Sequence, residues 1–119
     1  MSLTAQEILG ADDLAVEEVK TPEWGANVFI RQMQGKELGV FSKLLKGGKE
    51  VQEFPIRAIA VICALTLCDK DGKRLFPDHV KGADALEQKS AKVLQRIFSQ
   101  SMVLSALSTD DEEDTPKKS

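Results

Sequence analysis

The chain has 119 residues, the length of a single domain. Hydrophobic residues make up 42% and charged residues 29%, aromatic residues only 5%, and the formal net charge is −3. This balance argues against a general nucleic-acid-binding protein, a disulfide scaffold, a fibre and a membrane protein, because there is no cationic excess and too little cysteine. The longest apolar stretch, residues 58–68, is far shorter than the roughly 20 residues that span a bilayer.

The first ten residues predict a short capped helix. Ser2 or Thr4 can cap it, Glu7 stands three residues after Thr4 as in a capping box, and Gly10 ends it. No basic and apolar leader precedes this segment, so we expect no signal peptide and a cytoplasmic location.

Residues 14–33 predict a β-hairpin. Residues 14–21 alternate imperfectly between apolar and polar side chains, residues 27–33 alternate better, and Pro22-Glu23-Trp24-Gly25 between them is typical of a turn. Because an isolated hairpin is only marginally stable in water, we expect it to pack on the helices that follow.

The next segment, residues 35–46, has apolar residues at helical spacing and ends at Gly47-Gly48. Its opposite face carries Lys36, Lys43 and Lys46, which indicate a solvated surface or, as the alternative, a track for phosphates.

Residues 55–68 predict the central element of the fold, because nearly every side chain from Ile56 to Cys68 is apolar. The length of the run and its three alanines favour a helix, while its β-branched residues leave a buried strand open. Cys63 and Cys68 both lie in this run, and we expect them to be buried, reduced thiols.

The polar segment that follows predicts a turn at Asp69-Lys70-Asp71-Gly72. It is similar to part of a calcium-binding loop, but Leu67 stands where that loop requires an aspartate. His79 is the only histidine, and one histidine does not make a zinc site. We therefore expect no metal.

Residues 86–107 predict one long helix with an apolar stripe. Residues 108–119 predict a disordered acidic tail or linker, because Asp110 to Asp114 are five consecutive acids. The stripe consists of Ala91, Val93, Leu94, Ile97, Phe98, Met102, Leu104 and Ser105. Val103 and Leu107 lie on the other face, where they can contact the hairpin or a partner. The candidate contacts with a partner or a second copy are Trp24, Phe29, Val103 and Leu107.

Catalytic motifs are missing from the sequence. Gly47-Gly48 lacks the Lys-Ser/Thr pair of a phosphate-binding loop, and no nucleophile elbow is present. A Cys–His nucleophile would have to use Cys63 or Cys68, both expected to be buried. We therefore expect no enzymatic activity and no cofactor.

Three stretches, taken in order, resemble the tail assembly chaperones of long-tailed, siphophage-type bacteriophages. They are residues 24–37, beginning Trp24-Gly25, residues 64–76, with Asp69-Lys70-Asp71-Gly72 and Phe76, and residues 86–98, ending Arg96-Ile97-Phe98. Arg57 also fits the family pattern, whereas Gly47-Gly48-Lys49-Glu50 departs from it as an insertion. The resemblance covers about residues 1–107.

Residues and resemblance together predict an α+β, predominantly α-helical fold in which the hairpin packs on three to four helices. The resemblance implies a non-enzymatic, self-associating protein of the host cytoplasm that coats the tape measure protein, promotes tail-tube assembly and is absent from the mature virion. It implies three further partners: the major tail protein of the tube, a longer frameshifted form of the same chain, and other copies of it. The alternative is a small phage-encoded regulatory or nucleic-acid-binding module, suggested by Lys89, Lys92 and Arg96 on one helix face.

Overall fold

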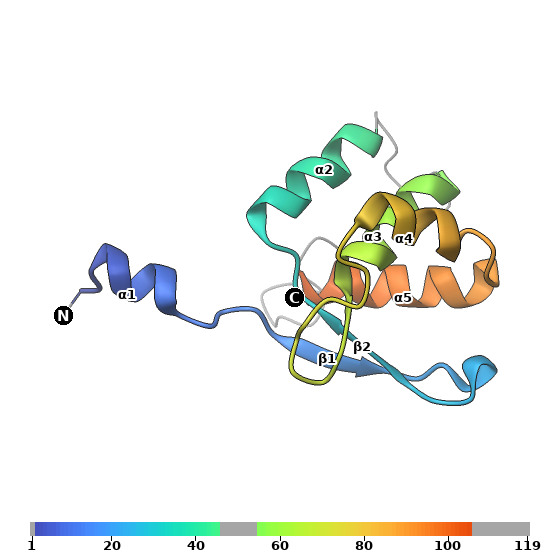
Figure 1. The fold of residues 1–119 in the computed structure, drawn as a ribbon, viewed down its shortest axis with the longest axis horizontal. Helices are drawn as coiled ribbons and strands as arrows, with labels where there is room; N and C mark the ends of the chain where they lie inside the picture. The colour runs from blue at the N-terminus through green and yellow to red at the C-terminus, as the bar shows by residue number, and fades with distance from the viewer. Residues whose placement is uncertain (1, 46–54, 106–119) are drawn as a thin grey trace, which may run out of the picture.

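The computed structural model describes residues 2–45 and 55–105. In this part of the chain, helices surround one central helix and a small antiparallel sheet lies beside them (Figure 1). The elements are α1 (Ala5–Gly10), β1 (Val16–Val19), the 3-10 helix η1 (Pro22–Trp24), β2 (Val28–Arg31), α2 (Gly35–Leu45), α3 (Ile56–Thr66), β3 (Leu67–Cys68), α4 (His79–Leu86) and α5 (Ala91–Leu104). The α+β, mostly helical fold predicted from the sequence is confirmed.

The sheet has the strand order β1-β2-β3 and is antiparallel throughout. In the predicted hairpin, Val19 of β1 pairs with Val28 of β2, and η1 forms the connection. Gly25 follows η1 with φ 84°, a left-handed conformation that glycine adopts without steric cost. The third strand is an addition that the sequence analysis did not predict: Leu67 of β3 pairs with Ile30 of β2.

Helix α3 forms the centre of the core. All its residues from Ala58 to Thr66 are buried, and it packs against α2, α4 and α5. Such all-round burial explains why the run is apolar on every side. The helix prediction is confirmed for Ile56–Thr66, but it is wrong for the last two residues, because Leu67–Cys68 continue as β3 to extend the sheet.

The single long helix predicted for residues 86–107 is wrong at its beginning. The chain turns after Leu86, the C-terminal residue of α4, and α5 begins at Ala91 after the extended residue Ser90. The turn lets both α4 and α5 pack against α3, which one straight helix could not do. The predicted stripe is confirmed at its centre, where five apolar residues are buried: Val93, Leu94, Ile97, Phe98 and Met102.

A buried ion cluster joins the hairpin to α2. Glu37, in the first turn of α2, accepts a hydrogen bond of 2.8 Å from Arg31 of β2, and Arg74 approaches the same carboxylate oxygen at 3.6 Å. The other carboxylate oxygen of Glu37 accepts the backbone N–H of Gln34 at 2.8 Å. Because an unpaired charge in this position would be costly, the cluster specifies how α2 leaves the sheet.

The two ends of the described chain differ in their contacts. Helix α1 has the predicted capping box between Thr4 and Glu7, but none of its residues is buried, and it stands apart from the body (Figure 1). The predicted tail of residues 108–119 and the glycine pair 47–48 lie outside the described residues. In the part of the chain that is described, no helix has the length and apolar character needed to cross a membrane.

Candidate partner-binding groove

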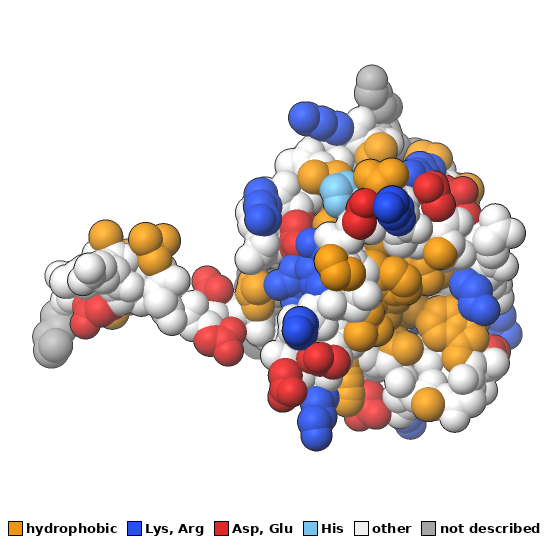
Figure 2. Space-filling view, in the orientation of Figure 1, with side chains coloured by type: hydrophobic (Ala, Val, Ile, Leu, Met, Phe, Trp, Pro, Cys, Tyr) orange, Lys and Arg blue, Asp and Glu red, His pale blue; other side chains and the backbone are white. Residues whose placement is uncertain are grey.

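An apolar groove opens between the tip of the hairpin and α4. Its volume is about 310 Å³, and only one charged residue, a lysine, contributes to its wall. The lining residues come from the hairpin, from β3, from the loop after it and from the end of α4: Trp24, Val28, Leu67, Leu75, Phe76, Ala85, Leu86 and Lys89. Figure 2 shows hydrophobic side chains gathered in a hollow on this face. We call this feature the apolar groove.

The hairpin tip holds Trp24 at the groove. The neighbouring Glu23 forms a two-pronged pair with Arg96 of α5, with both N–O distances 2.8 Å. Arg96 also donates to the backbone oxygen of Lys20 at 3.2 Å. The hydrogen bonds from Arg96 hold the pKa of Glu23 at about 2, against 4.5 normally. This pair fastens the tip to α5 and so positions the indole.

The loop between β3 and α4 places the opposite wall. The Asp69 carboxylate accepts the backbone N–H groups of Asp71 and Lys73 at 2.8 and 3.0 Å. The Leu75 N–H donates to the Leu67 oxygen at 3.0 Å. The turn is thus built by hydrogen bonds within the chain, and these hold Leu75 and the following Phe76 beside the groove.

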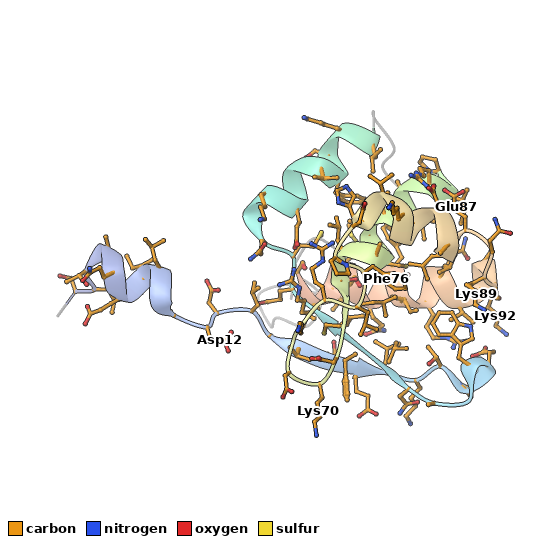
Figure 3. All side chains as sticks on the ribbon, in the orientation of Figure 1. Asp12, Lys70, Phe76, Glu87, Lys89 and Lys92 are labelled. Carbon is orange, nitrogen blue, oxygen red and sulfur yellow. The ribbon has the colours of Figure 1, made fainter. Side chains whose placement is uncertain are left out.

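Close packing behind the groove depends on Gly82 of α4. A Cβ atom at this position would lie 2.7 Å from Cβ of Phe76 and 3.1 Å from Cβ of Ala64. Glycine therefore lets α4 approach α3 and allows the Phe76 ring to lie against α4. Phe76 is near the centre of this face in Figure 3.

The rim of the groove carries charges of both signs, most of which are paired with each other. Its acids have arginine partners: Asp84 and Glu87 each pair with Arg57, at 2.7 and 3.0 Å, and Glu23 pairs with Arg96. Lys89, by contrast, forms no ion pair within residues 2–45 and 55–105. Figure 3 shows Lys89 and Lys92 at the same end of the molecule.

The three sequence-predicted contact residues that the structure describes, Trp24, Phe29 and Val103, lie in different surroundings. Trp24 lines the apolar groove. Phe29 lies on the other face of β2 from Val28 and the buried Ile30, because successive strand residues point to opposite faces. Val103 is half-buried near the end of α5, and Leu107 lies outside the described residues. Their contact with a partner stays a prediction.

Sequence reasoning missed most of the groove lining. Leu75 is an apolar residue in a polar turn segment and remains 50% exposed, which is an available but weak signal. Ala85 and Leu86 were assigned to no site, because the break between α4 and α5 was not foreseen. The groove depends on that break.

The two thiols have the properties of core residues. Burial raises the pKa of Cys63 to about 12, and its Sγ contacts the Leu94 oxygen at 3.5 Å. Burial also raises the pKa of Cys68, partly offset by the Arg31 charge. A thiol with a raised pKa is a poor nucleophile, so neither cysteine is prepared for catalysis. Among the described residues, no group of three His, Cys, Asp or Glu side chains could hold a metal ion.

The basic face suggested for nucleic acid is reduced by an internal contact. The Arg96 guanidinium binds Glu23 with both of its terminal nitrogens, and the Glu23 carboxylate brings a negative charge to the same face. Lys89 and Lys92 remain on this face as cations.

Comparison with known proteins shows a likeness of fold to a solved structure. No protein-family model matches the chain, and no curated protein sequence matches it significantly. The solved structure of the bacteriophage HK97 tail assembly chaperone superposes with a TM-score of 0.62 and 19% sequence identity. The match covers 83% of this chain and 94% of that one. The chain therefore has the fold of a tail assembly chaperone.

Proposed function

We propose that this protein is a phage tail assembly chaperone that covers apolar helical segments of a tape measure protein while the tail tube assembles. The observation that carries the proposal is the likeness of fold to the HK97 chaperone, which extends over nearly all of that chain. The open apolar groove supports it, because covering exposed apolar surface is what such a role requires.

The groove has properties suited to an amphipathic helix. Its volume of about 310 Å³ accommodates a few apolar side chains, such as those that one helix face presents at positions i, i+3 and i+4. With almost no polar group in the wall, binding depends on apolar contact and selects little among sequences. Each contact is then weak, tube subunits displace it, and stable coverage comes from many copies on one long client.

The proposal has further parts. The tube protein is the second partner, a longer frameshifted form of this chain is the third, and the complex forms in the host cytoplasm and leaves before the virion is complete. The protein acts without catalysing a reaction, to which the buried thiols with raised pKa values lend support.

The test is co-purification of the full chain with a tape measure protein, expressed from the same phage genome. We expect Leu75→Lys, on the groove wall, to weaken this binding about tenfold or more, as removal of a central apolar contact does. Leu38→Lys is the matched control, because Leu38 is 40% exposed on α2 and does not line the groove. Wild-type protein that never retains a tape measure protein would overturn the proposed function, and equal losses in both variants would remove the groove from it.

A further inference from the structure

The N-terminal arm, which we define as residues 2–13, carries an apolar face that no other described residue of its own chain buries. Leu9 is 85% exposed, Leu3 67% and Ile8 56%, and no residue of α1 is buried. Leu3 and Ile8 stand just before the cap and four residues into the helix, the positions that pack together in a hydrophobic staple. The arm thus presents one small apolar cluster.

Helix α1 is too short to be stable by itself. It has six residues, whereas isolated helices shorter than about 12 residues are marginal in water and depend on packing of an apolar face. The capping box between Thr4 and Glu7 shows that the segment is specified as a helix. To be stable as a helix, the arm therefore needs a surface on which its apolar side chains can pack.

The apolar groove offers the arm an apolar lining and one lysine. The arm contains the acids Glu7, Asp12 and Asp13 and no lysine or arginine. The groove is apolar inside, the acids at its rim share Arg57 and Arg96 as partners, and Lys89 in its wall forms no ion pair within the described residues. An acidic helix with one apolar face is the ligand that such a groove fits.

The position of the arm directs it to another molecule. Helix α1 lies at one end of the longest dimension, and Lys89 at the groove rim lies at the other end (Figure 3). The arm points away from the groove of its own chain. We propose that the arm of one copy binds in the apolar groove of a second copy, with Leu9 and Ile8 inserted beside Trp24 and Phe76.

This contact has a definite consequence for assembly. Arm and groove are different surfaces, so the interface is heterologous and each bound copy still offers one free arm and one free groove. Copies add head to tail into open chains or rings. A contact of three apolar side chains is small, so each junction is weak and association depends on concentration. The inference uses the groove of the proposed function but does not require a phage client.

The first experiment is sedimentation velocity of the full chain across a micromolar-to-millimolar series. We expect wild type to self-associate, and Leu9→Asp to weaken association about tenfold or more. Gln6→Asp is the matched control, because it adds the same charge to α1 and leaves Leu3, Ile8 and Leu9 in place. Neither variant endangers the core, since α1 has no buried residue. Lys89→Glu, on the groove side, should weaken association as well.

The second experiment uses Trp24, the only tryptophan of the chain, as a reporter inside the groove. Full-length Leu9→Asp protein has an open groove and the indole. Adding full-length Trp24→Phe protein supplies intact arms without fluorescence, and we expect Trp24 emission to shift to shorter wavelength. Trp24→Phe protein that also carries Leu9→Asp should leave the emission unchanged.

Three results would overturn the proposal. One is a wild-type protein that stays monomeric, and another is Leu9→Asp protein that associates as strongly as Gln6→Asp. The third is dilute monomeric wild type with Trp24 emission already shifted relative to Leu9→Asp, which would place the arm in its own groove. None of these requires a tape measure protein, so failure here is distinct from failure of the proposed function.

Discussion

The apolar residues around α3 and those of the groove belong to the same chemical class, but protein atoms enclose them to different degrees. Every residue from Ala58 to Thr66 is at most 4% exposed. In the groove, by contrast, Leu75 is 50% exposed beside a hollow of about 310 Å³. Burial of the first set stabilises the fold, whereas the second set retains exposed area that a partner can cover. Mutations around α3 should therefore lower the stability of the fold, whereas mutations in the groove should mainly weaken partner binding.

The largest expected effect is the loss of stability when a leucine of the core is truncated. Truncation of a groove leucine is the matched comparison. Leu94 of α5 is fully buried, and Leu94→Ala should lower the free energy of unfolding by about 2–5 kcal/mol, since it leaves a cavity in the core. Leu75→Ala removes a half-exposed side chain and should cost about 1 kcal/mol or less. Urea unfolding of both variants measures the difference. Equal losses would contradict the distinction between an enclosed and an open apolar region.

A smaller effect is expected where the two regions meet, at Gly82. A methyl group there collides with Phe76 in the groove wall and with Ala64 in α3, so Gly82→Ala should destabilise the protein by about 1–3 kcal/mol. Gly39→Ala in α2 is the control. Nothing lies within 4 Å of its added Cβ, and the better helix propensity of alanine should stabilise by about 0.5–1 kcal/mol. Thermal unfolding gives both signs in one assay, and a stabilising Gly82→Ala would mean that α4 moves away easily.

The same contrast explains how much of the molecule could be predicted from its sequence. The hairpin was predicted because alternation and Pro22-Glu23-Trp24-Gly25 are local signals, and the capping box because its two residues are three apart. The core stripe around Leu94 was predicted because a helix with one buried face has apolar residues that repeat every three to four positions in the sequence. These features depend on neighbours in the chain.

The features that were not predicted depend on tertiary contacts. Residues 86–90 carry no glycine or proline to end a helix, and the break arises because α4 and α5 both pack on α3. Strand β3 has only two residues and is specified by pairing with Phe29 and Ile30. The groove could not be predicted because Leu75 has the same sequence pattern whether it is covered or open.

The smallest expected effect concerns the Glu23–Arg96 pair, which connects the hairpin tip beside the groove to helix α5. Because the folded pKa of Glu23 is lowered to about 2 from 4.5, ionised Glu23 contributes stability that is fully present above about pH 4.5 and is lost as the pH falls toward 2. Glu23→Gln should therefore be less stable than wild type at neutral pH, and the difference between the two proteins should shrink between pH 4.5 and 2.

The pair is exposed to solvent, so the effect should be small and should weaken further in high salt. Unfolding free energies of the two proteins across this pH range measure it, and a carboxyl NMR titration of Glu23 checks the pKa directly. A difference that persists unchanged at pH 2 would mean that Glu23 fastens the hairpin tip by packing and not by its charge.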